Sequence, residues 1–266
     1  MTWTLAVTNQ KGGVGKTTTA VNLAASLADF GRRVLLIDLD PQGHATGGSG
    51  IDKHALESTV GDVLLGQKSF GEVCLRSEPG LYDVLPANGE LSGAEFQLVT
   101  RIGREMRLRK ALESVGGEYD FILIDCPPAL NTLTINGLVA ADDVLIPVQC
   151  EFLALEGLSD LLQTLEQVRG SVHDSLGIAG VLRTLYDARN RLAKDVSDQL
   201  LGHFAEKVFE STIPRNVRLA EAPGFGLPAL KYDKSSAGAE AYLALARELI
   251  KRALAQGRLS RARMKS

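Results

Sequence analysis

The residues best suited to chemistry lie near the start of the chain, in the segment of residues 8–18, which reads TNQKGGVGKTT. Glycines let backbone N–H groups approach phosphate oxygens without a side chain in the way. A helix expected to begin near Lys16 adds the partial positive charge of its N-terminus. There Lys16 can reach β- and γ-phosphates, and the Thr17 hydroxyl can ligate Mg²⁺. The alternative is a glycine-rich turn without a ligand. The residues expected around the phosphates are Lys11, Gly12, Gly13, Val14, Gly15, Lys16, Thr17 and Thr18.

Aspartates follow two apolar runs that we expect to be buried strands. Asp38 ends the run at residues 33–38 and Asp40 comes just after it, while Asp125 ends the run at residues 119–125. Ligands of open α/β sheets bind at the carboxyl ends of the strands. Asp125 is therefore predicted to hold Mg²⁺, directly or through water. A carboxylate near a γ-phosphate can orient a water molecule. Both Asp38 and Asp40 could instead be simple strand-end residues.

The elements that must position these residues alternate along the chain. Apolar runs predict buried strands at residues 4–8, 33–38, 119–125, 143–148 and 177–182. Apolar residues at helical spacing predict helices at residues 16–30, 91–115, 155–169, 190–205 and 236–255. This alternation predicts an α/β fold, a doubly wound, mostly parallel sheet with helices on both faces.

Length and composition fit one soluble domain. The chain has 266 residues, of which 45% are hydrophobic, and a net charge of −3. We expect a single domain over residues 1–256 and a basic, flexible tail over residues 257–266. The first residues do not resemble a signal peptide, and no apolar run is long enough to span a bilayer, so a cytoplasmic location is expected. Three cysteines without CxxC spacing fit reduced, packed thiols.

The phosphate-binding segment departs from the usual GxxxxGK[ST] pattern in two ways. Gln10 stands at the first glycine position, and Lys11 precedes the glycines. The resulting KGGVGKT resembles the deviant Walker A box of the ParA/MinD-like ATPases. In that family the extra lysine reaches across a dimer to the partner's nucleotide. The resemblance implies an ATP hydrolase with slow intrinsic turnover, in which Lys11 and Lys16 act on the phosphates and Asp40 polarises the attacking water.

The same resemblance implies ATP or ADP as ligand, with Mg²⁺ held by Thr17, Asp38 and Asp125. The segments at residues 181–189, 213–226 and 230–233 look like the ParA/Soj chromosome-partition branch. By that likeness Pro214 and Asn216 lie beside the adenine ring, where Asn216 can offer a donor and an acceptor. Asn216 could instead be the N-cap of a helix starting at Val217.

The branch implies a function in chromosome or plasmid partition. The ATP state would be a homodimer that binds DNA without sequence specificity, and a ParB-type partner would stimulate hydrolysis. Its location would be the nucleoid. Longer plasmid relatives carry a helix-turn-helix ahead of the phosphate loop, and no such segment stands there in this sequence, so contacts to DNA phosphates alone are expected.

The DNA surface must be a local basic patch, because the chain as a whole is slightly acidic. The alternative is an ordinary solvated basic face. The residues expected to contact DNA are Arg189, Arg215, Arg218, Lys231, Lys234, Lys251 and Arg252.

Two other functions share this type of loop. A MinD-like ATPase would position cargo or lie on a membrane through a C-terminal amphipathic helix. Here Leu259 and Met264 are the only sizeable apolar residues of the last ten, so membrane binding is not expected. A redox protein like the nitrogenase iron protein would need two cysteines per subunit for a shared cluster, and no second cysteine matches such a pattern beside Cys126.

Overall fold

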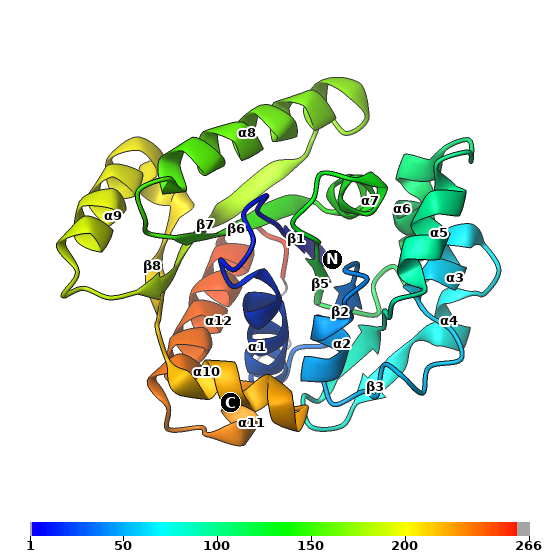
Figure 1. The fold of residues 1–266 in the computed structure, drawn as a ribbon, viewed down its shortest axis with the longest axis horizontal. Coiled ribbons are helices and arrows are strands. Elements are labelled where there is room, and N and C mark those ends of the chain that lie inside the picture. Colours follow the sequence, from blue (N-terminus) through cyan, green and yellow to red (C-terminus); the bar gives the residue numbers. More distant parts are fainter. Residues whose placement is uncertain (1, 260–266) are drawn as a thin grey trace.

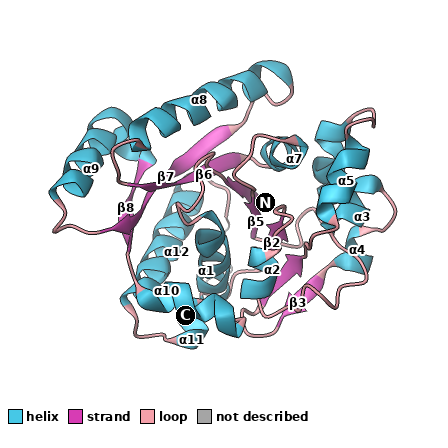
Figure 2. Cartoon of the chain, viewed as in Figure 1, coloured by secondary structure: helices cyan, strands magenta, loops and turns pink. Residues whose placement is uncertain are grey.

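The computed structural model describes residues 2–259, which form an eight-stranded sheet between two layers of helices (Figures 1 and 2). The strands lie side by side in the order β3-β4-β2-β5-β1-β6-β7-β8, and β3 alone is antiparallel to its neighbour within this sheet. In chain order the strands are β1 (Trp3–Val7), β2 (Val34–Asp38), β3 (Leu75–Ser77), β4 (Tyr82–Leu85), β5 (Phe121–Asp125), β6 (Asp143–Gln149), β7 (Gly177–Tyr186) and β8 (Val208–Pro214).

The helices fill the connections between these strands. The α-helices are α1 (Lys16–Asp29), α2 (His44–Gly48), α3 (Val60–Leu65), α4 (Phe70–Val73), α5 (Leu91–Leu98), α6 (Arg107–Glu113), α7 (Thr132–Ala140), α8 (Ala154–Ser171), α9 (Arg191–Phe204), α10 (Val217–Glu221), α11 (Ala229–Tyr232) and α12 (Ala237–Ala255). Short 3₁₀ turns are η1 (Arg104–Met106), η2 (Ala205–Lys207) and η3 (Ala222–Phe225).

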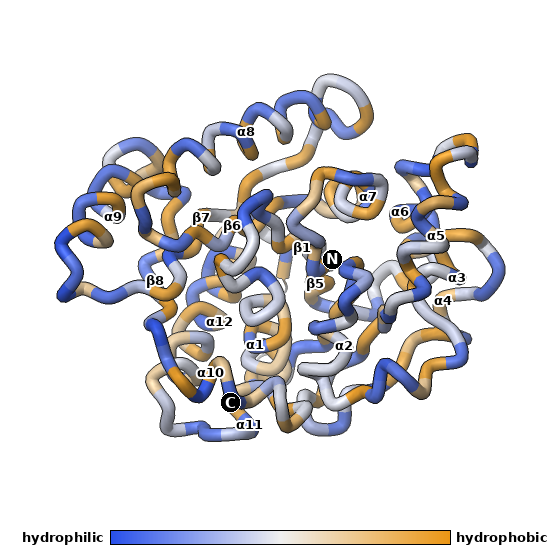
Figure 3. Tube along the Cα trace, viewed as in Figure 1, coloured by the Kyte–Doolittle hydropathy of each residue, from blue (hydrophilic) through white to orange (hydrophobic). Residues whose placement is uncertain are grey.

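Alternation along the central strands divides the core into two clusters, one on each face of the sheet. In β5, Phe121 and Leu123 pack with α1 and α12, whereas Ile122 and Ile124 pack with α5 to α8. Both sets are buried, which is why these strands read as continuous apolar runs. In Figure 3 the outer helix α8 alternates hydrophilic and hydrophobic residues, as expected for a helix with one face on the core.

The predicted fold class and the five predicted strands are confirmed, but the prediction of one helix over residues 91–115 is wrong. The segment forms α5, η1 and α6, with a break at residues 99–103. Gly103 lies in the left-handed region at φ 65°, where the chain turns. Asn136 of α7 holds the second part by accepting from the Leu108 N–H at 3.1 Å and donating to the Arg104 carbonyl at 2.8 Å.

The remaining differences concern short elements. Strands β3, β4 and β8 and helices α2, α3, α4, α7 and α11 were not predicted, since each is brief or lacks a clear period. β8 ends in a proline, which is tolerated because β8 is an edge strand of the sheet.

The first residues of the predicted tail are packed on the domain. Leu259 is buried in the core cluster around α1 and α12. Arg258 lies over the Trp3 ring, 5.2 Å from its centroid, and pairs with Asp143 at 2.9 Å. The Asp143 carboxylate also accepts from the Trp3 indole at 2.7 Å. Residues 257–259 therefore belong to the packed domain, and the rest of the predicted tail lies outside the described residues.

Candidate nucleotide site

The loop between β1 and α1, residues 8–15, is held open by its neighbours and is called the phosphate loop here. Gly13 and Gly15 have φ of 76° and 86°, which a residue with a side chain rarely adopts. A Cβ atom added at Gly12 or Gly13 would meet nothing within 4 Å. Asn9 ties the loop to β6, since its side chain donates to the Pro147 carbonyl at 2.8 Å and accepts from the Lys11 N–H at 2.9 Å. The glycines thus line open space in front of the N-terminus of α1.

The two lysines of the loop lie in different environments. Lys16 is 7% exposed, and burial lowers the pKa of its ammonium group, opposed by the charge of Asp125. Its Nζ donates to the Lys11 carbonyl at 3.1 Å, which folds the side chain back across the loop. Lys11 is on the outside, with its Nζ 3.4 Å from Glu151 and a side chain that is 38% exposed. Lys16 is therefore enclosed by its own chain, whereas Lys11 is accessible from outside.

Asp125 is a fully buried carboxylate whose charge is compensated only in part, by the ammonium group of Lys16. Neither oxygen has a hydrogen-bond partner among residues 2–259. The nearby Thr17 hydroxyl and the charge of Lys16 act to lower the pKa of Asp125. Burial, reinforced by the charges of Asp38 and Asp40, raises the pKa of Asp125 well above the usual value. A buried charge of this kind requires a cation or a proton.

Asp38 is the register partner of Asp125 on the neighbouring strand, as expected from strand ends that meet at one edge. Its environment differs from that of Asp125, because both Asp38 oxygens already accept hydrogen bonds. One accepts from the Asp40 N–H at 3.1 Å, and the other accepts from the N–H and hydroxyl of Thr46, each at 2.8 Å. Burial still raises the pKa of Asp38 to about 6. These three bonds fix the turn after β2 and leave the Asp38 carboxylate about one acceptor position for a metal ion or a water molecule bound to it.

Asp40 lies on this turn and is half-buried. One of its oxygens accepts from the Gln42 N–H at 2.9 Å, so the carboxylate is oriented by its own turn. Lys53 braces the same turn by donating to the Gln42 carbonyl at 2.6 Å. Asp40 remains accessible for a water molecule.

The chain fits Mg²⁺ only together with a phosphate ligand. No cluster of three or more His, Cys, Asp or Glu side chains capable of holding a metal ion occurs in residues 2–259. Mg²⁺ commonly uses one or two protein oxygens together with phosphate oxygens and water. The Asp125 carboxylate and the Thr17 hydroxyl supply that number, and the phosphate loop supplies the place for the phosphates.

A cavity of about 140 Å³ lies beside the phosphate loop, on the side of β7 and α10. Asn216 lines it, but Pro214 is not among its lining residues; Pro214 ends β8 and pairs with Tyr186 of β7. The Asn216 side chain caps α10 by accepting from the Arg218 N–H at 3.0 Å. The helix-cap role that the sequence left open is thus present, and the amide NH₂ remains as the group that can donate to a ligand.

Sequence reasoning missed two buried residues of this cavity, Thr184 and Tyr242. Thr184 donates to the Val14 carbonyl at 2.7 Å, and the Tyr242 hydroxyl lies 3.1 Å from the Thr19 hydroxyl of α1. Thr184 stands near the carboxyl end of a strand, so the strand-end rule could have found it. Tyr242 is on the distant helix α12, and no sequence pattern indicated it.

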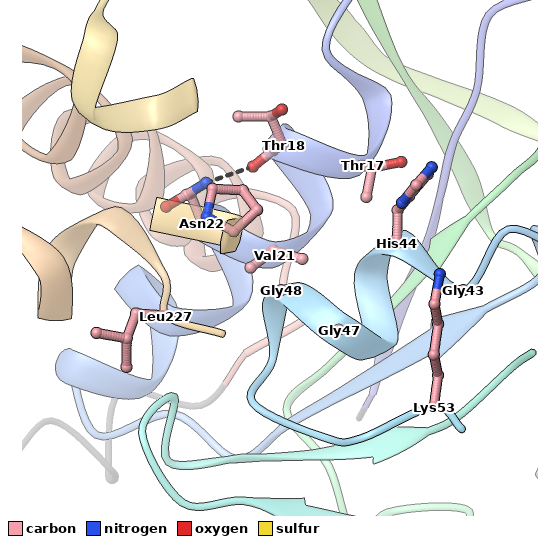
Figure 4. Close-up of a pocket in the computed structure, with 11 residues that line it drawn as sticks. Thr17, Thr18, Val21, Asn22, Gly43, His44, Gly47, Gly48, Lys53 and Leu227 are labelled. Carbon is pink, nitrogen blue, oxygen red and sulfur yellow. Dashed lines mark hydrogen bonds between the residues drawn. The ribbon is translucent and has the colours of Figure 1, made fainter. Parts of the chain in front are cut away.

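A second cavity, of about 430 Å³, lies on the other side of the N-terminus of α1 (Figure 4). Thr17 and Thr18 line it, opposite His44, and Thr18 also lines the first cavity. Space is therefore available on both sides of the hydroxyl groups that follow Lys16.

The three cysteines show no reactive environment. Cys126, next to Asp125, is buried, and burial raises the pKa of its thiol. Burial raises the pKa of Cys150 and of Cys74 to about 11. All three are free thiols.

The basic residues expected to contact DNA fall into different environments. Arg218 pairs with Glu221 at 2.7 Å and with Asp233 at 3.3 Å, while Arg189 forms a two-bond pair with Asp187. Arg252 is used inside the chain: its guanidinium donates to the carbonyls of Ala179 and Val208 and lies over the Phe209 ring. The others, which are exposed, are Arg215, Lys231, Lys234 and Lys251.

Comparison with known proteins identifies the family. A family model described as an AAA domain matches residues 2–178. The chromosome partitioning protein ParA of Caulobacter vibrioides is 53% identical over 251 residues, covering 93% of this chain and 94% of that protein. The sporulation initiation inhibitor protein Soj of Bacillus subtilis is 52% identical over 245 residues, covering 92% of this chain and 97% of that protein. This chain belongs to the ParA/Soj family of chromosome-partitioning ATPases.

Solved structures agree on the fold of this ParA/Soj chain but differ in the functions they are named for. A protein of Mycobacterium smegmatis named cobyrinic acid a,c-diamide synthase, with bound ADP and magnesium, is 41% identical with a TM-score of 0.84 over 97% of both chains. The septum site-determining protein MinD of Pyrococcus horikoshii, complexed with Mg-ADP, is 26% identical with a TM-score of 0.78, covering 98% of this chain and 100% of that one. The fold is thus shared by proteins with different names. Within residues 2–259, no helix has the length and apolar composition of a membrane span.

The incompletely compensated charge of Asp125 leads to a prediction about stability. Asp125→Asn should raise the free energy of unfolding of the nucleotide-free protein by about 2 kcal/mol at pH 8, because the neutral amide avoids burying a charge. The pKa of Asp125 is raised in the folded state, so the wild-type cost grows as pH rises and falls as the carboxyl is protonated. Urea unfolding at several pH values between 6 and 8 measures the difference.

The matched control is Asp38→Asn, at the register partner of Asp125. This substitution should lower the free energy of unfolding, because its amide NH₂ would face one of the N–H groups that now donate to the carboxylate. If Asp125→Asn also destabilised the nucleotide-free protein, Lys16 would compensate the Asp125 charge fully within the chain, and the metal-site interpretation would fail.

Proposed function

We propose that this chain is an ATP-dependent DNA-partition ATPase that binds Mg²⁺ and ATP at the phosphate loop. The observation that carries the proposal is the division between its two loop lysines. Lys16 is buried in the site of its own chain, whereas Lys11 extends outward to Glu151. An outward lysine adjacent to a phosphate site is placed to serve a second copy of the chain, as the resemblance implies. The ParA/Soj relatives that are more than half identical support the same role.

Each residue of the site then has a distinct task. Backbone N–H groups of the loop and Lys16 bind the phosphates, and Thr17 and Asp125 provide oxygens for Mg²⁺. When bound, Mg²⁺ supplies charge neutralisation for the phosphate oxygens. Asp40 orients a water molecule, whose oxygen forms a bond to the γ-phosphorus while the bond to the ADP oxygen breaks. The proton lost by the water passes to the released phosphate or to solvent.

Homodimer formation would complete this arrangement. Lys11 would leave Glu151 and reach the γ-phosphate of the partner, adding positive charge where negative charge develops in the transition state. The present pair is half-exposed, so its loss costs little. Few groups assist the water, which fits slow turnover until a ParB-type partner stimulates it. The protein would act in the cytoplasm, associated with the nucleoid.

A MinD-like membrane role is less well supported. Of the two sizeable apolar residues near the C-terminus, Leu259 is 8% exposed and packs in the core, so it is not available to lipid. Met264 lies outside the described residues.

Two substitutions test the hydrolysis proposal. Lys16→Ala should abolish detectable nucleotide binding, because it removes the buried cation of the site. Asp40→Ala should keep ATP affinity within about threefold of wild type but lower kcat by about 10²-fold or more, as expected for loss of the group that orients the attacking water. Calorimetric binding and phosphate release measure the two effects. Hydrolysis by Asp40→Ala at the wild-type rate would show that another group orients the water.

We further propose that the DNA surface centres on α10, α11 and the start of α12, which pack together in Figure 1. Residues 215–236 contain four cations and two carboxylates, a net charge of +2, in a chain whose total is −3. The cations are Arg215, Arg218, Lys231 and Lys234. Lys251 lies about 22 Å farther along α12, counting 1.5 Å per residue from Ser236.

The salt dependence of binding tests this surface. Each phosphate contact contributes about 0.9 to the slope of log K against log salt concentration. Arg218→Ala should therefore weaken binding of the ATP form to random-sequence DNA and lower the slope by about one. Lys251→Ala, with the same change of charge, should have a smaller effect. Equal effects of the two variants would contradict a surface centred on α10, and the absence of DNA binding by wild type at low salt would exclude the DNA proposal.

A further inference from the structure

Thr184 contacts the phosphate loop from a strand that the loop does not belong to. It lies near the carboxyl end of β7 and is 2% exposed. Its hydroxyl donates to the Val14 carbonyl at 2.7 Å. A Cβ atom added at Gly15 would lie 3.9 Å from the Cβ and Cγ2 of Thr184, which is ordinary contact distance. Thr184 thus both packs against the loop and bonds to it.

This bond fixes the direction of one peptide group. A trans peptide is planar, so its carbonyl and the following N–H point in opposite directions. The Val14 carbonyl points to Thr184, and the Gly15 N–H therefore points away from β7, to the other side of the loop. Gly15, which follows this peptide, has a positive φ and no side chain to restrict it, so its own backbone would leave the peptide's orientation weakly determined.

The segment of β7 that carries Thr184 is itself anchored. The preceding residue, Arg183, donates to Ser197 of α9 at 2.9 Å and to the Phe209 carbonyl of β8 at 2.9 Å. The following residue, Leu185, has φ 49°, a conformation that a leucine keeps only where its surroundings impose it. The hydroxyl of Thr184 is therefore presented from a fixed frame.

We propose that Thr184 is a positioning residue of the nucleotide site. Its hydroxyl holds the Val14–Gly15 peptide in the orientation that presents the Gly15 N–H to the phosphates of the nucleotide. Thr184 itself touches no phosphate. This inference rests on the proposed function, because it requires a nucleotide at the phosphate loop.

Calorimetric titration with Mg-ADP and steady-state ATP hydrolysis test the inference. Thr184→Val has the same shape without the hydroxyl, and it leaves the Val14 carbonyl without its donor. It should weaken Mg-ADP binding by about tenfold. KM for ATP should rise by a similar factor while kcat at saturation stays within about twofold, because the bond acts on binding in the ground state and the transition state alike. Thr184→Ser, which keeps the hydroxyl, should remain within about threefold of wild type.

Ser197→Ala is the matched control, since it removes a bond from the adjacent Arg183 without touching the phosphate loop. It should lower the unfolding temperature but leave Mg-ADP affinity unchanged. Wild-type affinity in Thr184→Val, equal weakening in Ser197→Ala, or failure of Thr184→Ser to restore binding would each overturn the inference. If Thr184→Val did not fold, Thr184→Ala would replace it, with the same expected loss. Wild-type protein that bound no nucleotide would instead overturn the proposed function.

Discussion

The structure depends on a buried negative charge that the nearby Lys16 neutralises only in part. Asp125 stands at the end of a central strand, fully buried and without a hydrogen-bond partner among the described residues. Without a ligand, such a group lowers the stability of the chain, since a buried charge without full compensation destabilises the fold. Lys16 is a buried positive charge, which is also unfavourable, because burial lowers the pKa of its ammonium group. Both costs are explained if the site is built for a ligand that carries phosphates and Mg²⁺.

The parallel sheet brings these groups together. β2, β5 and β1 are neighbours, so Asp38, Asp125 and the start of the phosphate loop meet at one edge. The two aspartates are register partners in different environments, because Thr46 donates two hydrogen bonds to Asp38, whereas the Asp125 oxygens have no hydrogen-bond partner among the described residues. On the other side of the loop, β7 fixes a peptide through Thr184. The sheet therefore determines both the charge and the shape of the site.

Much of this site could be predicted from the sequence, because it depends on local signals. The glycine pattern, Lys16 and the strand-end aspartates each follow from spacing and strand polarity. The hydrogen bonds that Thr46 donates to Asp38 could not be predicted, since they depend on a turn that brings Thr46 of α2 back to the end of β2. Asn216 had two open roles, and only the path of β8 into α10 shows that its carbonyl oxygen caps the helix. The break between α5 and α6 likewise depends on Asn136, a residue of a distant helix.

The central claim is that Asp125 needs a cation that arrives with phosphates. The most direct measurement is the unfolding temperature of wild-type protein with Mg²⁺ alone, ADP alone and both together. At a hundred times Kd, bound ligand stabilises by about 2.7 kcal/mol, or about 5–10 °C for a domain of this size. The account predicts that increase only when Mg²⁺ and ADP are both present. An equal increase with ADP and a chelator would contradict it, because Asp125 would then tolerate the phosphates without a cation.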